Sequence, residues 1–437
     1  MAPQTADVVI IGGGPAGAAA GALLAKHGVS VELFECERFP RHHVGESLQP
    51  ALFQLLDHHF GLGPKFATCG FALKFGALYV WGESRKPWSV LFDPRLERDL
   101  PSLDAASLVS GGYEHAWQVD RAQFDTVLLE NARAHGAHVH EGVEISGLVL
   151  DGPRVVGVRC DDGTEIRAGL VLDASGQRCV VGRHFGLVDD VPDLRATATY
   201  AYYDGAGGVA GPLGRHVQLL VTVPEGWVWF IPISPDRTSV GVVVRERSRL
   251  DLARFGAIVE ASGVPLGKGS LVNPADPLFH VRDWSYALRR SVGPGWIAIG
   301  DAACFVDPIL SGGVDFAVRG GLNAATAYLR VREGSDEQPT YSELESRLRR
   351  EYRAYLRLAR YWYQNNRSVD SFFWEAHAEL ADESLATPLR AFVYLTSGRY
   401  AADNHFRVFQ QWQEEKMFRA LGVDPGTIAR AIRERGR

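Results

Sequence analysis

The chain is short of cysteines, has no excess of basic residues and has no long apolar run, and each absence excludes a class of protein. Only five of its 437 residues are cysteine, and none stands in a C-x-x-C or Cys/His spacing, so we expect neither a metal site nor a disulfide framework. The net charge of -6 offers no basic surface for nucleic acid. No apolar stretch approaches the roughly 18 residues of a membrane span. We therefore expect a cytoplasmic protein with no nucleic-acid partner and no membrane partner.

The N-terminal segment is expected to enter a strand by Asp7, which leaves no room for a standard export signal. The chain shows no internal repeats and no long low-complexity linker. Its 46% hydrophobic and 22% charged residues are typical of a globular protein. At this length we expect one large domain or two closely joined ones.

Residues 7–35, DVVIIGGGPAGAAAGALLAKHGVSVELFE, read as an apolar strand, a glycine turn, an alanine-rich helix and a second apolar strand. The turn carries G-x-G-x-x-G, whose glycines let the backbone approach a pyrophosphate at the helix N-terminus. An acid ends the second strand at the spacing expected for a ribose-binding residue. A similar stretch, GAGGVA at 205–210, precedes no helical pattern and is expected to be a loop. The predicted nucleotide-binding residues are Gly12, Gly14, Ala16, Gly17 and Glu35.

The rest of the chain favours FAD over NAD as the nucleotide. WIAIGDAA at 296–303 predicts a buried strand before a helix, where the carboxylate of Asp301 could reach the ribityl hydroxyls of a flavin; a simple helix cap is the alternative. No second strand-GxGxxG-helix unit is available for a nicotinamide cofactor. We therefore expect FAD that is reduced by a separate flavin reductase.

The pattern downstream alternates between strands and helices. Spacing predicts a helix from Arg121 to about His135 and strand-rich segments over 138–174. Residues 195–245 alternate strands and turns, which predicts a second, mostly antiparallel sheet. After Asp301 the periodicity is helical to the end of the chain.

Four motifs resemble the flavin-dependent halogenases, within the larger group of FAD monooxygenases. They are GESLQP at 45–50, Lys74 in an apolar run, WVWFIP at 227–232 and FVDPILSGG at 305–313. The last two fit that family's W-x-W-x-I-P and F-x-x-P-x-x-S-x-G, and the match covers essentially the first 330 residues. We expect an α/β fold with a Rossmann-like FAD-binding domain, an inserted, mostly antiparallel substrate domain and a helical C-terminal region. The expected limits are 1–190 with 285–330, 191–284, and 331–437.

The resemblance implies that reduced FAD and dioxygen form a flavin hydroperoxide, which oxidises chloride or bromide to hypohalous acid. Lys74 matches the lysine that then activates the oxidant for electrophilic halogenation of an electron-rich arene. A partly dry pocket would lower the pKa of this amine and favour that role. Residues 71–82, FALKFGALYVWG, read as one buried strand without an acidic residue to pair with Lys74. Taken alone, such a lysine more often guards an edge strand or snorkels to the surface.

The glycine-rich turn of the third motif can point backbone N–H groups at an anion just before a helix. By resemblance Ser311, Gly312 and Gly313 bind the halide, and the same loop lies against the isoalloxazine; a flavin-packing loop without halide is the alternative. The two arginines among the implied contacts could instead form ordinary ion pairs. The further cofactor contacts implied are Arg38, Arg121, Pro308, Gly313 and Val314.

Trp227 and Trp229 stand two apart, so on a strand they share one face. A hydrophobic stripe would explain them; the resemblance implies instead that they keep organic substrate away from the flavin. Glu46 and Ser47 are expected to line the flavin side of the passage. Ser47 is also expected to cap the following helix.

Tryptophan halogenases carry a glutamate directly before the motif serine, where this chain has Leu310. A phenol or pyrrole, free or tethered to an acyl or peptidyl carrier protein, is therefore the better prediction, in a natural-product or antibiotic pathway. The aromatic-rich residues 360–377 could cover the substrate pocket or form core.

One alternative function is an FAD-dependent aromatic hydroxylase or epoxidase, whose D-G fingerprint is replaced by DASG at 173–176. The other is a non-catalytic flavin-binding scaffold.

Overall fold

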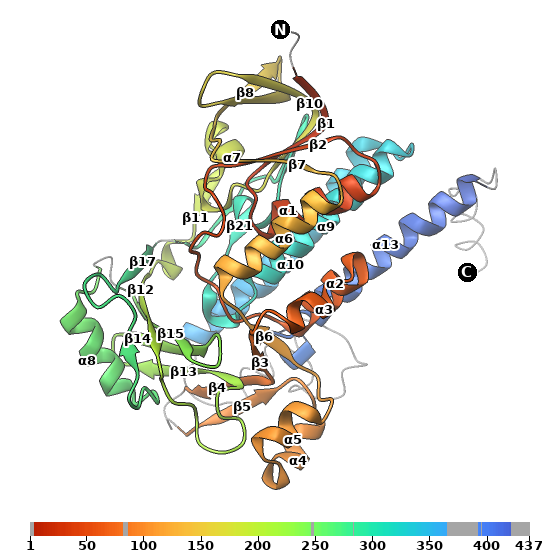
Figure 1. The fold of residues 1–437 in the computed structure, drawn as a ribbon. Coiled ribbons are helices and arrows are strands. Elements are labelled where there is room, and N and C mark those ends of the chain that lie inside the picture. The colour runs from red at the N-terminus through yellow and green to blue at the C-terminus, as the bar shows by residue number, and fades with distance from the viewer. Residues whose placement is uncertain are drawn as a thin grey trace.

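The computed structural model describes residues 4–81, 86–245, 249–282, 284–364, 392–394 and 396–420. They form two large sheets joined by a set of long helices (Figure 1). The α/β fold expected from the sequence is confirmed, including the mostly antiparallel second sheet and the helices that follow residue 331.

The first sheet contains the N-terminal βαβ unit. Its central strand β1 (Gln4–Ile11) runs parallel to β2 (Val31–Glu35) and to β10 (Glu165–Asp173). The strand order is β19-β20-β10-β1-β2-β7, and the β8–β9 hairpin extends it from β10. The carboxyl ends of the parallel strands meet at one edge, where ligands bind in open α/β sheets. The other strands are β7 (His138–Glu141), β8 (Ile145–Asp151), β9 (Arg154–Cys160), β19 (Val292–Gly293) and β20 (Trp296–Ala298).

Helices cover this sheet and reach toward the second one. Helix α1 (Pro15–Lys26) packs against α6 (Arg121–Ala134) and α9 (Gly313–Arg332), side by side in Figure 1. A Cβ atom on Gly321 of α9 would overlap the carbonyl oxygen of Ala16, so the α1–α9 approach requires glycine there. The other helices are α2 (Pro50–Phe60), α3 (Gly63–Ala67), α4 (Arg95–Asp99), α5 (Ala105–Ser110), α7 (Val180–His184), α8 (Leu252–Ser262), α10 (Glu337–Gln364) and α13 (Arg399–Ala420).

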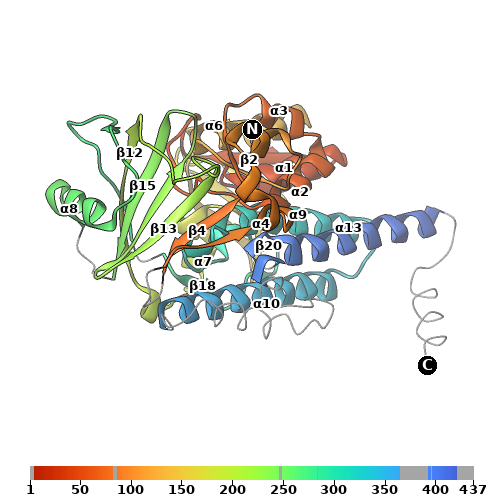
Figure 2. The same ribbon diagram turned by 90° about the horizontal axis from the view of Figure 1, so that it is seen from below.

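The second sheet has the order β16-β12-β15-β14-β13-β4-β5, and β17 pairs with β12. All its pairs are antiparallel except β4 with β13. Figure 2 shows α8 and α10 on different sides of it; the Val228 and Phe230 face packs on α8, and the Trp227 face packs on α10. Its strands are β4 (Gly76–Val80), β5 (Trp88–Leu91), β12 (Thr197–Asp204), β13 (Val217–Val223), β14 (Gly226–Pro232), β15 (Arg237–Val244), β16 (Ser270–Leu271) and β17 (Phe279–Arg282).

Residues 71–81 are buried or half-buried, as expected, but the single strand predicted over 71–82 is wrong. Strand β3 (Ala72–Lys74) pairs with β6 (Ala116–Gln118), whereas β4 belongs to the second sheet. The chain changes partners at Phe75, and the next residue, Gly76, packs so closely on the backbone of Val90 that no side chain fits there. The domain limits remain a prediction, and β4 and β5 add residues 76–91 to the sheet of the inserted region.

Three short strands, β11 (Val188–Asp190), β18 (Tyr286–Leu288) and β21 (Cys304–Phe305), connect the two large sheets. All five cysteines are free thiols. None of the described helices combines the length and the apolar character needed to cross a membrane. Over the same residues, no three His, Cys, Asp or Glu side chains are grouped so that they could hold a metal ion.

Candidate active site

The glycine turn and the acid of the βαβ unit lie together at the edge of the first sheet. Glu35 ends β2, is buried, and accepts a hydrogen bond from the backbone N–H of Gly13 at 2.7 Å. Gly12 has φ of +102°, and a Cβ on Gly17 would overlap the carbonyl oxygen of Gly12. The turn is therefore a tight backbone cradle at the N-terminus of α1, which suits a pyrophosphate.

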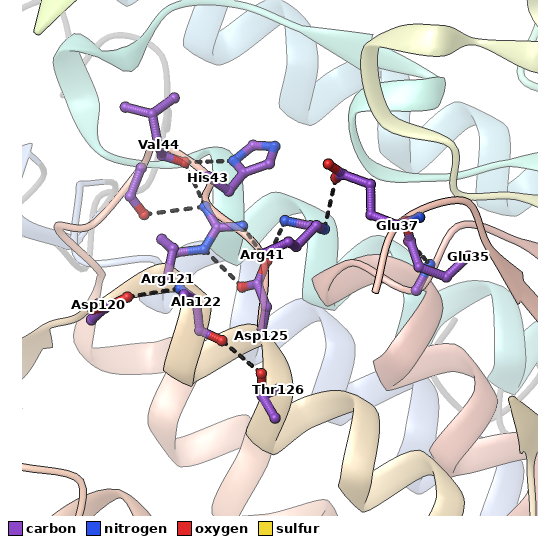
Figure 3. A network of polar contacts seen from close by, with 12 residues as sticks. Glu35, Glu37, Arg41, His43, Val44, Asp120, Arg121, Ala122, Asp125 and Thr126 are labelled. Atoms are coloured by element: carbon purple, nitrogen blue, oxygen red, sulfur yellow. Dashed lines mark hydrogen bonds and ion pairs between the residues drawn. The ribbon is translucent and has the colours of Figure 1, made fainter. Parts of the chain in front are cut away.

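Two arginines meet beside this turn (Figure 3). Arg121 is buried, donates to both oxygens of Asp125 at 2.8 and 2.9 Å, and donates to the Val44 carbonyl at 2.7 Å. Most of its guanidinium N–H groups are thus used within the protein, which is what we expect if Arg121 forms an ordinary ion pair. Its predicted FAD contact stays a prediction.

Arg41 is a candidate cofactor residue that the sequence reasoning missed. Its Nη2 lies 3.3 Å from the position of a Cβ on Gly14, directly over the glycine turn. Its Nη1 is buried, lies 3.3 Å from Asp125, and makes no hydrogen bond to any described residue. Ion pairs with Glu37 and Asp125 hold the guanidinium so that Nη2 reaches the turn, and a cation held over a phosphate cradle fits a bound dinucleotide. By contrast, Arg38 is exposed and lies against Gly142; only the ERFPR spacing links the two arginines.

We expect Arg41→Met to weaken FAD binding about 10–100-fold, because charge-assisted hydrogen bonds contribute about 1.5–3 kcal/mol each. Fluorescence titration of the apoprotein with FAD measures this change. Arg38→Met is the matched control, since its side chain lies away from the turn. Equal losses in both variants would contradict the assignment.

Asp301 lies in a short 3-10 turn (Gly300–Ala302) after β20, at the same edge. Its carboxylate makes no hydrogen bond within the described residues. Burial raises the pKa of Asp301 to about 7, and the charge of Arg121 opposes that rise. A partly desolvated carboxyl with free acceptors suits a hydroxyl donor such as the ribityl chain. The carboxylate at the end of β10 is already used within the protein. Asp173 accepts hydrogen bonds from Ser175 and from the Val181 N–H, which fix the turn after β10.

The loop predicted to bind halide joins a 3-10 turn (Pro308–Leu310) to α9. Ser311 has φ of +54° and donates its hydroxyl to Gln218 Oε1 at 3.0 Å. A Cβ on Gly312 would lie 2.7 Å from the Tyr355 ring, and one on Gly313 would lie 2.8 Å from the Phe305 ring. Both glycines are thus required by packing, and their N–H groups begin α9, where an anion is favoured. The halide role of the three residues stays a prediction.

Lys74 is buried, with 2% of its surface exposed, so the surface readings that the sequence left open are wrong. Its Nζ donates to the Leu48 carbonyl at 3.0 Å and lies 5.4 Å from the centre of the Phe92 ring. No carboxylate pairs with it among the described residues. Desolvation alone lowers the pKa of Lys74 to about 7.

The GESLQP segment connects Lys74 to the halide loop. Leu48 accepts from Lys74, and the next residue, Gln49, donates its side-chain amide to the Leu310 carbonyl at 3.2 Å. The amine and the loop therefore lie on two sides of one short segment. Sequence spacing could not show this, because Leu48 and Leu310 are far apart in the chain.

Glu46 is buried and accepts a hydrogen bond from the Tyr202 hydroxyl at 2.8 Å; burial raises the pKa of Glu46.

Ser47 is also buried, but the helix cap predicted for it is wrong. Helix α2 begins at Pro50 with Gln49 as N-cap, because Ser47 instead forms a strand-like bridge with Gln118. The Ser47 hydroxyl has no hydrogen-bond partner within the described chain.

The tryptophan pair lies on one face of β14, as expected, with ring centres 5.9 Å apart. Trp229 donates to Ser239 at 3.1 Å, and Trp227 donates to the Tyr363 hydroxyl at 2.9 Å. Tyr363 in turn donates to Asp307, whose carboxylate accepts the Ile309 N–H of the halide loop. The pair is therefore tied to the loop; its role in excluding substrate stays a prediction.

Tyr363→Phe is expected to lower the free energy of unfolding by about 1–3 kcal/mol, because Trp227 loses its buried acceptor and Asp307 loses a donor. Burial raises the pKa of Asp307 to about 6 and Tyr363 lowers it, so the variant should raise it further. Denaturant unfolding at pH 5 and pH 8 measures both effects. The loss should be larger at pH 8, where wild-type Asp307 is charged; an equal loss would contradict this linkage.

Of the aromatic-rich residues 360–377, only 360–364 are described; the rest lies outside the described residues. Trp362 is fully buried and packs on the Tyr79 and Trp81 rings, in the same hydrophobic cluster as the tryptophan pair. Trp362 is therefore core, and the covering role of the segment stays a prediction.

The tryptophan halogenase family model matches residues 7–99 and 97–436. The chain therefore belongs to the flavin-dependent halogenase family. The pyrrole-2-carbonyl peptidyl-carrier-protein chlorinase of Pseudomonas fluorescens is 32% identical over 80% of this chain and 81% of its own length. The tryptophan 2-halogenase of Chondromyces crocatus is 30% identical over 88% of this chain and 72% of its own length.

Solved structures agree with this assignment. The myxobacterial chondrochloren halogenase CndH has a TM-score of 0.74 at 32% identity, covering 94% of this chain and 93% of its own. The flavin-dependent brominase Bmp2 has a TM-score of 0.74 at 26% identity, covering 94% and 100%. This halogenase is thus an oxidoreductase whose cofactor is FAD and whose co-substrate is a halide.

Proposed function

We propose that this halogenase places chlorine or bromine on an electron-rich phenol or pyrrole, free or tethered to a carrier protein, and that Lys74 delivers the halogen. The observation that supports it is a buried amine without a carboxylate partner, one short segment away from the halide loop. The relatives include a pyrrolyl-carrier-protein chlorinase, and a structural neighbour, PltM, is known in complex with phloroglucinol.

Bound reduced FAD and dioxygen supply the oxidising equivalent that turns halide into hypohalous acid. The N–H groups of Gly312 and Gly313, at the start of α9, hold the halide. The ammonium of Lys74 uses one N–H on Leu48 and keeps two for the oxygen of hypohalous acid. The arene carbon then takes the halogen, the oxygen takes a proton from the Lys74 ammonium and leaves as water, and the proton lost by the arene restores the ammonium.

Leu310, buried before Ser311, offers no carboxylate to a substrate amine. This favours phenol or pyrrole over tryptophan, although a tryptophan 2-halogenase is among the relatives. A separate reductase is proposed because the chain has a single G-x-G-x-x-G unit; a cytoplasmic location stays a prediction.

The test supplies the protein with reduced FAD, bromide or chloride, and free and carrier-tethered phenols and pyrroles, alongside tryptophan. Product masses are then read. We expect halogenated phenol or pyrrole. Products that contain added oxygen but no halogen would favour the hydroxylase alternative, and halogenation of tryptophan alone would overturn the substrate class.

A further inference from the structure

A cavity lies at the end of the tryptophan face that is farther from Lys74. It has a volume of about 160 Å³ and lies where β13 turns into β14. The halide loop contacts Gln218 near the start of β13, whereas Thr222, which lines the cavity, stands four residues further along. Since a strand rises about 3.3 Å per residue, roughly 13 Å of strand separates the two sites. Lys74 stands just before β4, whose Ala77 pairs with Gln218, so it lies at the halide-loop end of these strands and away from the cavity.

The walls of this cavity suit a planar apolar ring. Three indoles line it: the Trp81 ring centre lies 6.3 Å from that of Trp227 and 5.7 Å from that of Trp362. All three side chains are buried. A volume near 150 Å³ is enough for benzene, so a single aromatic ring fits.

The polar groups that line the cavity would donate hydrogen bonds to an acceptor carried by that ring. The indole N–H of Trp81 and the hydroxyl of Thr222 are buried and have no hydrogen-bond partner within the described chain. Trp81 is 96% buried, since only 4% of its surface is exposed. Native proteins rarely leave such donors unpaired, so a polar ligand atom or an ordered water is expected beside them.

Charge at the mouth makes the preferred acceptor an anion. Arg245 lies 5.6 Å from the Tyr363 ring centre, donates to the Asp193 carbonyl, and pairs with no carboxylate among the described residues. Arg195 is already paired with Asp190 at 2.9 Å. Glu225, also on the lining, is exposed to water and opposes the anion only weakly. The carboxylates of Asp193 and Asp307 act on Arg245 electrostatically, but Asp193 is paired with Arg360 and neither forms an ion pair with Arg245, so Arg245 is the lining cation left for a ligand carboxylate.

We infer that this cavity binds a monocyclic aromatic carboxylate, at a site separate from the one where halogenation is proposed. Its wall includes Trp227 and Tyr363, and Tyr363 contacts Asp307 beside the halide loop. Binding here can therefore influence the loop without contact with Lys74.

The test titrates benzoate, and its neutral analogue benzamide, into the FAD-loaded protein by isothermal calorimetry. We expect saturable one-to-one binding of benzoate and at least tenfold weaker binding of benzamide, because only the anion pairs with Arg245. Arg245→Gln should remove this preference, and Thr222→Val should weaken benzoate binding about threefold to tenfold.

Lys74→Met is the control that separates the two sites, and it should bind benzoate as the unchanged protein does. Loss of binding in Lys74→Met would place benzoate in the active site and overturn the inference. A preference for benzoate that survives in Arg245→Gln, or no saturable heat, would also overturn it. Because none of these readings uses halogenation, the inference can fail while the proposed function stands.

Discussion

Lys74→Ala is expected to lose halogenation by about 10²–10⁴-fold, the range for a positioned proton donor, and to keep FAD binding and flavin oxidation by dioxygen. The amine touches neither the glycine turn nor the arginines beside it, so the cofactor site is unchanged. Single-turnover assays with reduced FAD, bromide and a phenol measure the halogenation step, and absorbance at the flavin band measures oxidation. Regioselective halogenation at the unchanged rate would refute the role of Lys74.

Two further variants separate chemistry from packing. Lys74→Met keeps the apolar stem of the side chain and should be as inactive as the alanine variant. Lys65→Ala, in the exposed part of α3, should keep full activity. Recovery of activity in Lys74→Met would show that the cavity in the alanine variant, and not the missing amine, had caused the loss.

The pH dependence follows from the pKa of Lys74, which burial lowers to about 7. If the ammonium is the donor, the rate should fall as pH rises through about 7. The free energy of unfolding should instead rise with pH, because below pH 7 the folded protein holds a desolvated charge. Lys74→Met should thus be more stable than the unchanged protein at pH 7, and this advantage should shrink as pH rises toward 10.5. A rate that rises with pH would instead favour transfer through a neutral, halogenated amine.

Much of this architecture could be predicted from local patterns. The glycine turn, Glu35 and the helix at 121–134 follow from spacing, because each depends on neighbours in sequence. The shared face of Trp227 and Trp229 follows from strand periodicity. Lys74 was predicted to be buried only because three other motifs accompanied it.

Other features depend on contacts that no local pattern encodes. The break at Phe75 exists because β3 and β4 find partners in different sheets. Arg41 stands over Gly14 because the segment after β2 folds back on the turn, so only the three-dimensional structure distinguishes it from Arg38. Ser47 failed as a helix cap because pairing with Gln118 extends the chain until Pro50.

Arg319→Met is expected to lower the free energy of unfolding by about 3–5 kcal/mol, the usual cost of leaving one side of a buried ion pair unpaired. Arg319 is fully buried in α9, where it donates to Asp315 at 2.8 Å and to Glu351 of α10 at 2.6 Å. Asp315 lies two residues after Gly313, so this network holds the start of α9 against α10 directly behind the halide loop. Denaturant unfolding measures the loss, and a weaker apparent halide affinity should accompany it.

The pH dependence distinguishes this explanation from simple loss of packing. Burial already raises the pKa of Asp315, and Arg319 opposes that rise, so removing the arginine raises it further. An acid whose pKa is raised in the folded state costs stability where it is ionised and not where it is protonated. The stability lost in Arg319→Met should therefore shrink as pH falls from 7 toward 4. Arg347→Met is the matched control, because its surface pair with Glu343 contributes less than about 1 kcal/mol. If the Arg319 deficit were independent of pH, lost packing rather than unpaired charge would be its cause.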